Sequence, residues 1–136
     1  MNKNKGFTLL ELLVVIGIIA ILIAFTSASY STAQRGGRDA RRKSDLKAMQ
    51  DALEQDYADS SFSYPTTCSD ASTNLKSAWP DDPINDATYF YVETCSATTY
   101  CICARVEKSG TGNATDDDCG NADWGSGDYF CVGALQ

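Results

Sequence analysis

Histidine is absent from this chain of 136 residues. Histidine is the commonest general base of enzymes and the commonest metal ligand of proteins, so its absence argues against catalysis. We therefore expect a protein that is not an enzyme, with no catalytic residue and no required cofactor.

Basic residues are scarce in the second half of the chain. From Ser61 onward there are three Lys and Arg residues against eleven Asp and Glu residues, a balance of −8. Phosphate binding needs clustered cations, so such an acidic region should repel nucleic acid and anionic membrane surfaces. A DNA-binding role for the basic stretch 35–43 is an alternative, but we do not expect nucleic acid as a partner.

Proline does not occur before Pro65, and the apolar residues are concentrated at the start of the chain. Lys3 and Lys5 form a short basic leader, and an apolar stretch follows at residues 7–25. Nineteen helical residues span about 28 Å, close to the thickness of the hydrocarbon core of a bilayer. The stretch therefore predicts a helix that is long enough to cross a membrane once.

Glu11 interrupts this apolar stretch. A charge that faces lipid costs on the order of 3 kcal/mol at the bilayer centre and less near its edge. Three explanations are open. The positive end of the helix macrodipole favours an acid in the first turns, the carboxylate reaches the wet interface, or a cation of another subunit pairs with it.

The residues around Glu11 are Lys5-Gly6-Phe7-Thr8-Leu9-Leu10-Glu11-Leu12-Leu13. They resemble the class III signal of type IV prepilins and type II secretion pseudopilins, in which a basic leader ends in Gly and precedes Phe, an apolar helix and a Glu at the fifth mature position. The resemblance implies that an inner-membrane prepilin peptidase cleaves between Gly6 and Phe7 and that Phe7 is then N-methylated. It also implies that Glu11 pairs with the Phe7 amino group of a neighbouring subunit, which fixes the register of assembly.

The function implied by this resemblance is that of a structural subunit of a type IV pilus or a related pseudopilus. The precursor is then a single-pass protein of the inner membrane, in contact with lipid. A pilus assembly platform polymerises it into a helical homo-oligomer at the cell surface. Two features depart from the family: no helix-bending proline occurs in the first 60 residues, and the cations at 35–43 lie on the exported side, against the positive-inside tendency.

Other functions compete with this interpretation. Thr26-Ser27-Ala28 has the small residues of an ordinary signal peptidase site, and cleavage near Ala28 would release a secreted soluble domain that starts at Ser29. A minor pilin or competence pseudopilin in DNA uptake and a permanently membrane-anchored binding protein are further alternatives.

The resemblance also implies an α+β pilin fold, with one long helix and a small antiparallel sheet packed on its C-terminal half. We expect a leader peptide at 1–6, a transmembrane and filament-core helix at 7–29, an amphipathic helical stem at 30–60 and a globular β head at 61–136.

The stem carries one apolar stripe. Leu46, Met49, Leu53 and Tyr57 recur at spacings of three and four, which places them on one face of a helix. We expect this stripe to pack on the sheet of the same chain.

Charges along the stem are segregated. Residues 35–47 hold six basic and two acidic residues, whereas residues 48–60 hold four acidic and no basic ones. The common explanation is a solvated face with local pairs such as Asp39 with Lys43. We add the hypothesis that the basic block of one subunit faces the acidic block of a staggered neighbour. Charge reversal at Arg41 and Arg42 would then impair assembly and leave the monomer stable.

Three segments of the head predict strands, at residues 88–94, 99–107 and 128–132, because each is rich in aromatic and β-branched residues. Alternation along the second strand places an apolar set toward the stem and Cys101 with Cys103 on the other face; the apolar set is Tyr100, Ile102, Ala104 and Val106. In the third strand, Phe130 and Val132 should point inward.

Six cysteines lie in the polar part of the chain, at Cys68, Cys95, Cys101, Cys103, Cys119 and Cys131. Behind an export signal, an even number in a short domain predicts disulfides. A zinc site is the alternative, but the one close pair, Cys101-Ile102-Cys103, does not have the C-x₂-C spacing. Sequence alone leaves the pairing open; a bridge from Cys131 to Cys101 or Cys103 fits the strand alternation.

An acidic, glycine-rich loop lies between the last two predicted strands, at residues 110–125. It is similar in character to the calcium loop of major pseudopilins, which implies a calcium site formed by some of Asp116, Asp118 and Asp123. The EF-hand pattern does not fit the loop. A solvated acidic loop tied down at Cys119 is the alternative.

Overall fold

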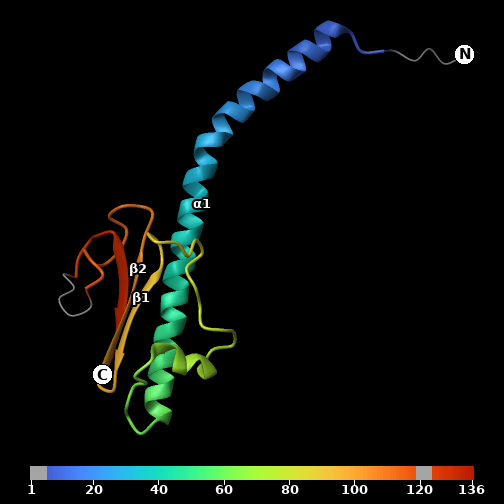
Figure 1. The fold of residues 1–136 in the computed structure, drawn as a ribbon. Coiled ribbons are helices and arrows are strands. Elements are labelled where there is room, and N and C mark those ends of the chain that lie inside the picture. Colours follow the sequence, from blue (N-terminus) through green and yellow to red (C-terminus); the bar gives the residue numbers. More distant parts are fainter. Residues whose placement is uncertain (1–5, 119–123) are drawn as a thin grey trace, which may run out of the picture. The chain divides into compact units, whose positions relative to one another are not determined.

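The computed structural model describes residues 6–118 and 124–136, and of residues 25–29 only the backbone. A single helix, α1 (Leu9–Asp59), is followed by a 3₁₀ helix, η1 (Cys68–Asn74), and by three strands, β1 (Tyr91–Ser96), β2 (Thr99–Arg105) and β3 (Tyr129–Gly133) (Figure 1). The chain forms two compact units, Met1–Gln34 and Arg35–Gln136, and α1 runs through both.

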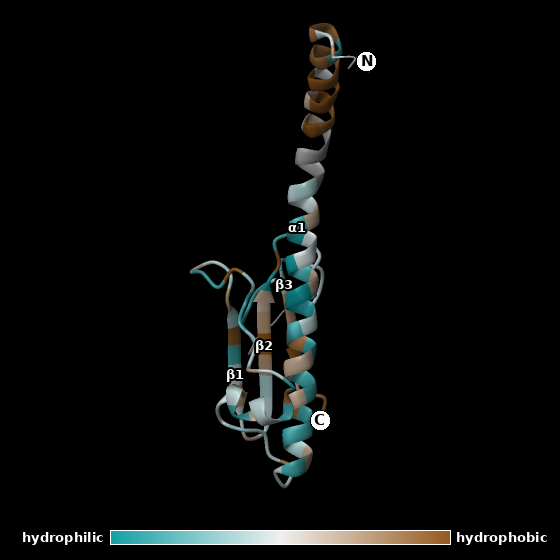
Figure 2. Cartoon of the chain, turned by 90° about the vertical axis from the view of Figure 1, so that its right-hand side faces the viewer, coloured by the Kyte–Doolittle hydropathy of each residue, from teal (hydrophilic) through white to brown (hydrophobic). Residues whose placement is uncertain are grey.

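Between Leu9 and Ile23 the helix of the first unit is apolar on all sides apart from Glu11. Its side chains from Leu9 to Ile23 are exposed, between 49% and 82% for the large hydrophobic ones, and Figure 2 shows this part of α1 in brown. A helix that is hydrophobic all round needs a lipid or protein environment to cover it. Within the described residues, no helix combines the length and the apolar character needed to cross a membrane.

The second unit places a three-stranded antiparallel sheet along its own part of α1, in the order β1-β2-β3 (Figure 2). Leu46, Met49 and Leu53 are completely buried, and Tyr57 packs against them. The predicted stripe and the predicted α+β arrangement are therefore confirmed. The sheet contributes Tyr100, Ile102, Ala104 and Val132 to the same core.

The opposite face of β2 holds the cysteines. Cys103 and Cys131 are directly opposite each other in the β2–β3 register and form a disulfide. Cys103 is thus the partner of Cys131, out of the two that the sequence left open. Cys101 is also disulfide-bonded, and Cys119 lies outside the described residues. A second disulfide, Cys68–Cys95, links η1 to β1, so the predicted disulfide framework is present.

The first strand begins three residues later than predicted. Residues 88–90 have strand composition, but Asp86 holds them in a turn: its Oδ1 accepts hydrogen bonds from the backbone N–H groups of Thr88 and Tyr89, both at 2.8 Å. A short acid that bonds to the backbone two and three residues ahead favours a turn over a strand. The strand therefore starts at Tyr91.

Gly127 lies where two backbone segments of the head come together. A Cβ at this position would overlap the carbonyl of Ala114. We expect Gly127→Ala to lower the free energy of unfolding by about 1–3 kcal/mol, the usual cost of overpacking. Gly125→Ala is the matched control, because nothing lies within 4 Å of a Cβ there. Equal melting temperatures for the two variants would contradict this packing.

Candidate functional site

The start of α1 is a reciprocal capping box. Thr8 precedes the helix, and its Oγ1 accepts a hydrogen bond from the Glu11 backbone N–H at 3.2 Å. In return, Glu11 Oε2 accepts from the Thr8 backbone N–H at 2.8 Å and from the Thr8 hydroxyl at 2.9 Å. This is the Thr-x-x-Glu pattern, in which two side chains satisfy the free donors of a helix start.

The capping box is a local explanation of Glu11 beyond the three given above, and its signal in the sequence is the pattern Thr8-Leu-Leu-Glu11. It uses one carboxylate oxygen, Oε2. Phe7, directly before the cap, is 88% exposed. The cap therefore holds the charge of Glu11 one turn from the residue that the prepilin signal would make the new N-terminus.

Most cations in the basic block of the stem, residues 35–47, bond to acceptors of the same chain. Arg42 has no exposed surface, and its guanidinium donates to Asp82 at 2.6 and 3.0 Å, to Asp39 at 2.8 Å and to Glu107 at 2.9 Å. Arg38 makes a two-pronged ion pair with Glu107, with both distances 2.6 Å. These five side chains form an ion network that ties the stem to two loops of the head.

This network corrects two expectations for the stem. Asp39 pairs with Arg42, and accepts from the backbone of residues 107 and 108, rather than pairing with Lys43. Lys43 instead donates to the carbonyl of Thr111 at 2.7 Å. Arg42 is therefore not available to a neighbouring subunit, and its charge reversal would disrupt the monomer, contrary to our hypothesis.

Two acids of the network, Glu107 and Asp82, have lowered pKa values. Hydrogen bonds from Arg38, with those from Arg42, outweigh burial and lower the pKa of Glu107 from 4.5 to about 2. Burial alone would raise the pKa of Asp82, but hydrogen bonds from Arg42 and from the Ile84 backbone outweigh it, and the pKa is lowered. Both carboxylates therefore stay ionised in the folded head at mildly acidic pH.

A group whose pKa is lower in the folded state contributes stability above its unfolded pKa and loses it as the pH falls toward its folded pKa. For Glu107 this window runs from about pH 4.5 down to about pH 2. We expect the melting temperature to fall across this window. Glu107→Gln should lower the melting temperature at neutral pH and flatten its dependence on pH. An unchanged pH profile in that variant would contradict the role of the network.

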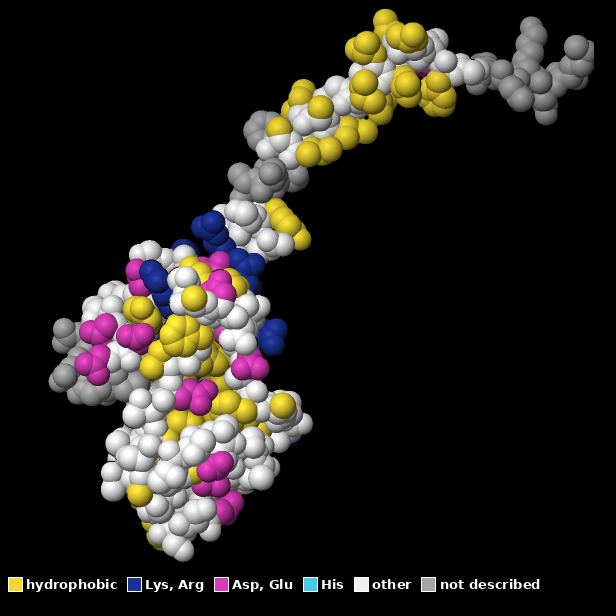
Figure 3. Space-filling model, viewed as in Figure 1, with side chains coloured by type: hydrophobic (Ala, Val, Ile, Leu, Met, Phe, Trp, Pro, Cys, Tyr) yellow, Lys and Arg dark blue, Asp and Glu magenta, His cyan; other side chains and the backbone are white. Residues whose placement is uncertain are grey.

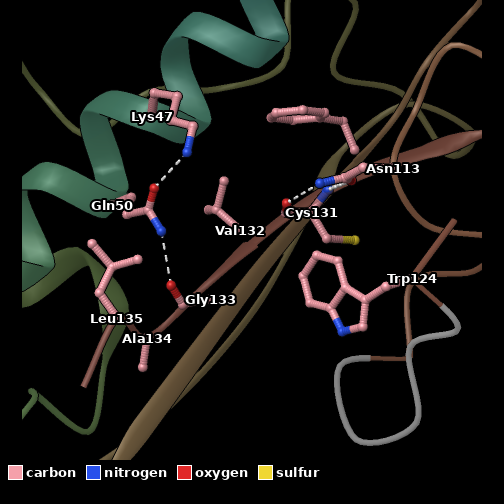
Figure 4. Close-up of a pocket in the computed structure, with 10 residues that line it drawn as sticks. Lys47, Gln50, Asn113, Trp124, Cys131, Val132, Gly133, Ala134 and Leu135 are labelled. Atoms are coloured by element: carbon pink, nitrogen blue, oxygen red, sulfur yellow. Dashed lines mark hydrogen bonds between the residues drawn. The ribbon is translucent and has the colours of Figure 1, made fainter.

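A groove of about 310 Å³ lies beside β3 (Figure 4). Its polar groups hold the head together: Lys47 donates to Gln50, and Gln50 donates to the carbonyl of Gly133, both at 2.8 Å. Asn113 exchanges two hydrogen bonds with the backbone of Cys131, at 2.7 and 2.9 Å. Among the described lining residues, no nucleophile is paired with a general base.

The acidic loop of the head is described in part. Asp116 and Asp118 lie within the described residues, where the Asp118 backbone donates to Asp116 Oδ1 at 3.2 Å; Asp123 lies outside them. The described residues contain no group of three potential metal ligands. Calcium binding stays a prediction: millimolar calcium should raise the melting temperature, and Asp116→Asn should abolish that rise. No shift would end the hypothesis.

The comparisons with known proteins agree with the geometry of the N-terminal segment. Residues 1–27 match the family model described as the prokaryotic N-terminal methylation motif. No curated protein and no solved structure shows a significant match to the chain. The matched motif is typical of type IV pilins and pseudopilins, and it includes the first part of α1, the long helix on which a disulfide-stabilised antiparallel sheet packs. The chain therefore combines an N-terminal methylation motif with a pilin-like α+β arrangement.

Proposed function

We propose that this protein is a structural subunit of a type IV pilus or a related pseudopilus. Its precursor is held in the inner membrane by residues 7–29, cleaved between Gly6 and Phe7 by a prepilin peptidase and N-methylated at Phe7. The assembly platform then polymerises it through α1 into a surface filament. The observation that carries the proposal is a methylation motif that extends into the first part of α1, where the apolar side chains of the helix are exposed.

The uncovered surface of the first unit supports polymerisation. Its exposed residues between Leu9 and Ile23 form a contiguous apolar surface. Burying apolar surface contributes roughly 25 cal/mol per Å². Helices of many copies that pack against one another would bury this surface as completely as lipid does, so a subunit can leave the membrane for a filament core without exposing it to water.

The capping box supports the pairing of Glu11 with a neighbour. The bonds to Thr8 use Oε2 of the carboxylate, which leaves Oε1 for the amino group of a second Phe7. A charge buried among apolar helices is costly unless a counter-charge accompanies it. A cleaved subunit supplies such a counter-charge at its new N-terminus, so cleavage and assembly are chemically linked.

The head has a structural part in this function. The disulfides Cys68–Cys95 and Cys103–Cys131 and the ion network of Arg42 stabilise a small core, in which three short strands cover one helix. Disulfides contribute about 2–4 kcal/mol each. A head of this kind is suited to the outside of a cell, where thiols are oxidised and filaments experience force.

The mass of the N-terminal peptide tests the proposal. Filaments sheared from cells that make this protein should contain a chain that begins at Phe7 and carries one methyl group. A chain that begins at Ser29 in the culture medium would instead show release by ordinary signal peptidase. A chain that keeps Met1 in the membrane and is missing from filaments would show a permanent anchor. Either result would overturn the proposal.

A further inference from the structure

The end of α1 is electrostatically unusual. Its last turn contains Asp56 and Asp59 and no basic residue. The C-terminus of a helix carries the negative end of the macrodipole, where cations stabilise and acids destabilise. The chain therefore concentrates negative charge at this end of its second unit and supplies no cation of its own in that turn.

The residues that follow present an aromatic side chain beside these acids. Ser61 and Phe62 both have positive φ angles, 59° and 63°, a conformation that favours glycine. The Phe62 N–H closes the turn on the carbonyl of Tyr57 at 3.0 Å, and the two rings meet edge to face at 5.7 Å. Phe62 nevertheless remains 74% exposed. We call residues 59–62 the tip.

The opposite end of the second unit is basic. Five of the six cations of the stem make polar contacts within the chain, whereas Arg35 and Lys108 are exposed. The Lys108 backbone N–H donates a hydrogen bond to Asp39, which lies one helical turn from Arg35. Arg35 and Lys108 therefore form one basic patch. We call Arg35 and Lys108 the collar. In Figure 3 the Lys and Arg side chains gather at this end, and the charged side chains visible at the other end are acidic.

The tip and the collar lie at opposite ends of one rigid helical segment. Arg35 and Asp59 are separated by 24 helical residues, about 36 Å. Two complementary patches so far apart on one chain do not bind each other within that chain. They fit between copies, in a heterologous contact that repeats without closing and so builds an open helical filament.

We propose that the tip of one subunit docks on the collar of a second copy. Asp59 pairs with Arg35 or Lys108 of that copy, and Phe62 lies against the same cations, which are attracted to the face of an aromatic ring. This inference rests on the proposed filament function and adds to it a second contact, between heads, that is separate from the apolar core.

Charge reversal and exchange test the contact in the full chain, in cells that assemble it. We expect Asp59→Lys and Arg35→Glu each to lower the yield of sheared filaments at least tenfold, because each places like charges against one another. The double variant should restore the yield to within threefold of the wild type. Phe62→Ala should lower it severalfold.

Two controls match these variants. Asp51→Lys and Arg41→Glu make the same charge changes on the same helix, at exposed positions outside the tip and the collar. Contrary to the hypothesis that whole charged blocks of the stem face one another, both should polymerise like the wild type. Lys108→Glu replaces Arg35→Glu if the latter lowers the melting temperature of the head. Single reversals that assemble normally, or a double variant that fails while its head is stable, would overturn the docking. No filaments from the wild type would overturn the proposed function instead.

Discussion

Arg42→Met is expected to lower the free energy of unfolding by about 3–5 kcal/mol, the cost of removing one partner from a buried ion pair. The side chain of Arg42 is completely buried and bonds to three carboxylates. Methionine fills a similar apolar volume but leaves Asp39, Asp82 and Glu107 facing one another with less counter-charge. Since small domains are stable by only about 5–15 kcal/mol, this loss is a large share of the stability of the head.

Urea unfolding of the purified full chain, followed by the fluorescence of Trp79 and Trp124, measures this effect. Arg41→Met is the matched control, because the Arg41 side chain is 64% exposed and makes one long pair, at 3.5 Å, with Asp45. We expect it to change stability by less than about 0.5 kcal/mol. Equal stabilities of the two variants would contradict the network as the link between stem and loops.

The features of this fold that could be predicted are those that depend on local patterns in the sequence. The stripe of Leu46, Met49 and Leu53 repeats at helical spacing, and the alternation of Tyr100, Ile102 and Ala104 assigns both faces of β2. Because that alternation also fixes where Cys103 points, one disulfide partner of Cys131 was among the two expected. The spacing of apolar residues along a helix and the alternation of side chains along a strand are sufficient to predict such features.

The ion network could not be predicted in the same way. A run of cations on a helix usually marks a solvated face, and burial of Arg42 depends on two acids that lie 40 and 65 residues further along the chain. Local spacing contains no information on such partners. The late start of β1 is a different case, since the bonds of Asp86 to its own turn are a local pattern that competes with strand composition.

Glu11→Gln is expected to abolish most filament assembly while leaving the start of α1 intact. Glutamine accepts the same capping hydrogen bonds as glutamate, since the capping box allows either residue. It cannot neutralise an ammonium group. If the Phe7 amine of a neighbour is buried beside residue 11, each subunit would then carry an unpaired buried charge, which costs several kcal/mol.

Thr8→Ala is the reciprocal variant, because it removes the side-chain cap and keeps the charge of Glu11. Loss of a helix cap costs about 1 kcal/mol, here at one end of a long helix. We therefore expect Thr8→Ala to assemble nearly as well as the wild type. Together, Glu11→Gln and Thr8→Ala separate two explanations of Glu11. In the first it caps its own helix; in the second its charge pairs with the amino group of a neighbouring subunit.

The yield of sheared filaments, compared at equal amounts of cleaved chain in the membrane, decides between these explanations. Our account predicts at least a tenfold loss for Glu11→Gln and less than a twofold loss for Thr8→Ala. Normal filaments from Glu11→Gln, with Thr8→Ala defective, would show that residue 11 caps its own helix and has no part in joining one subunit to the next.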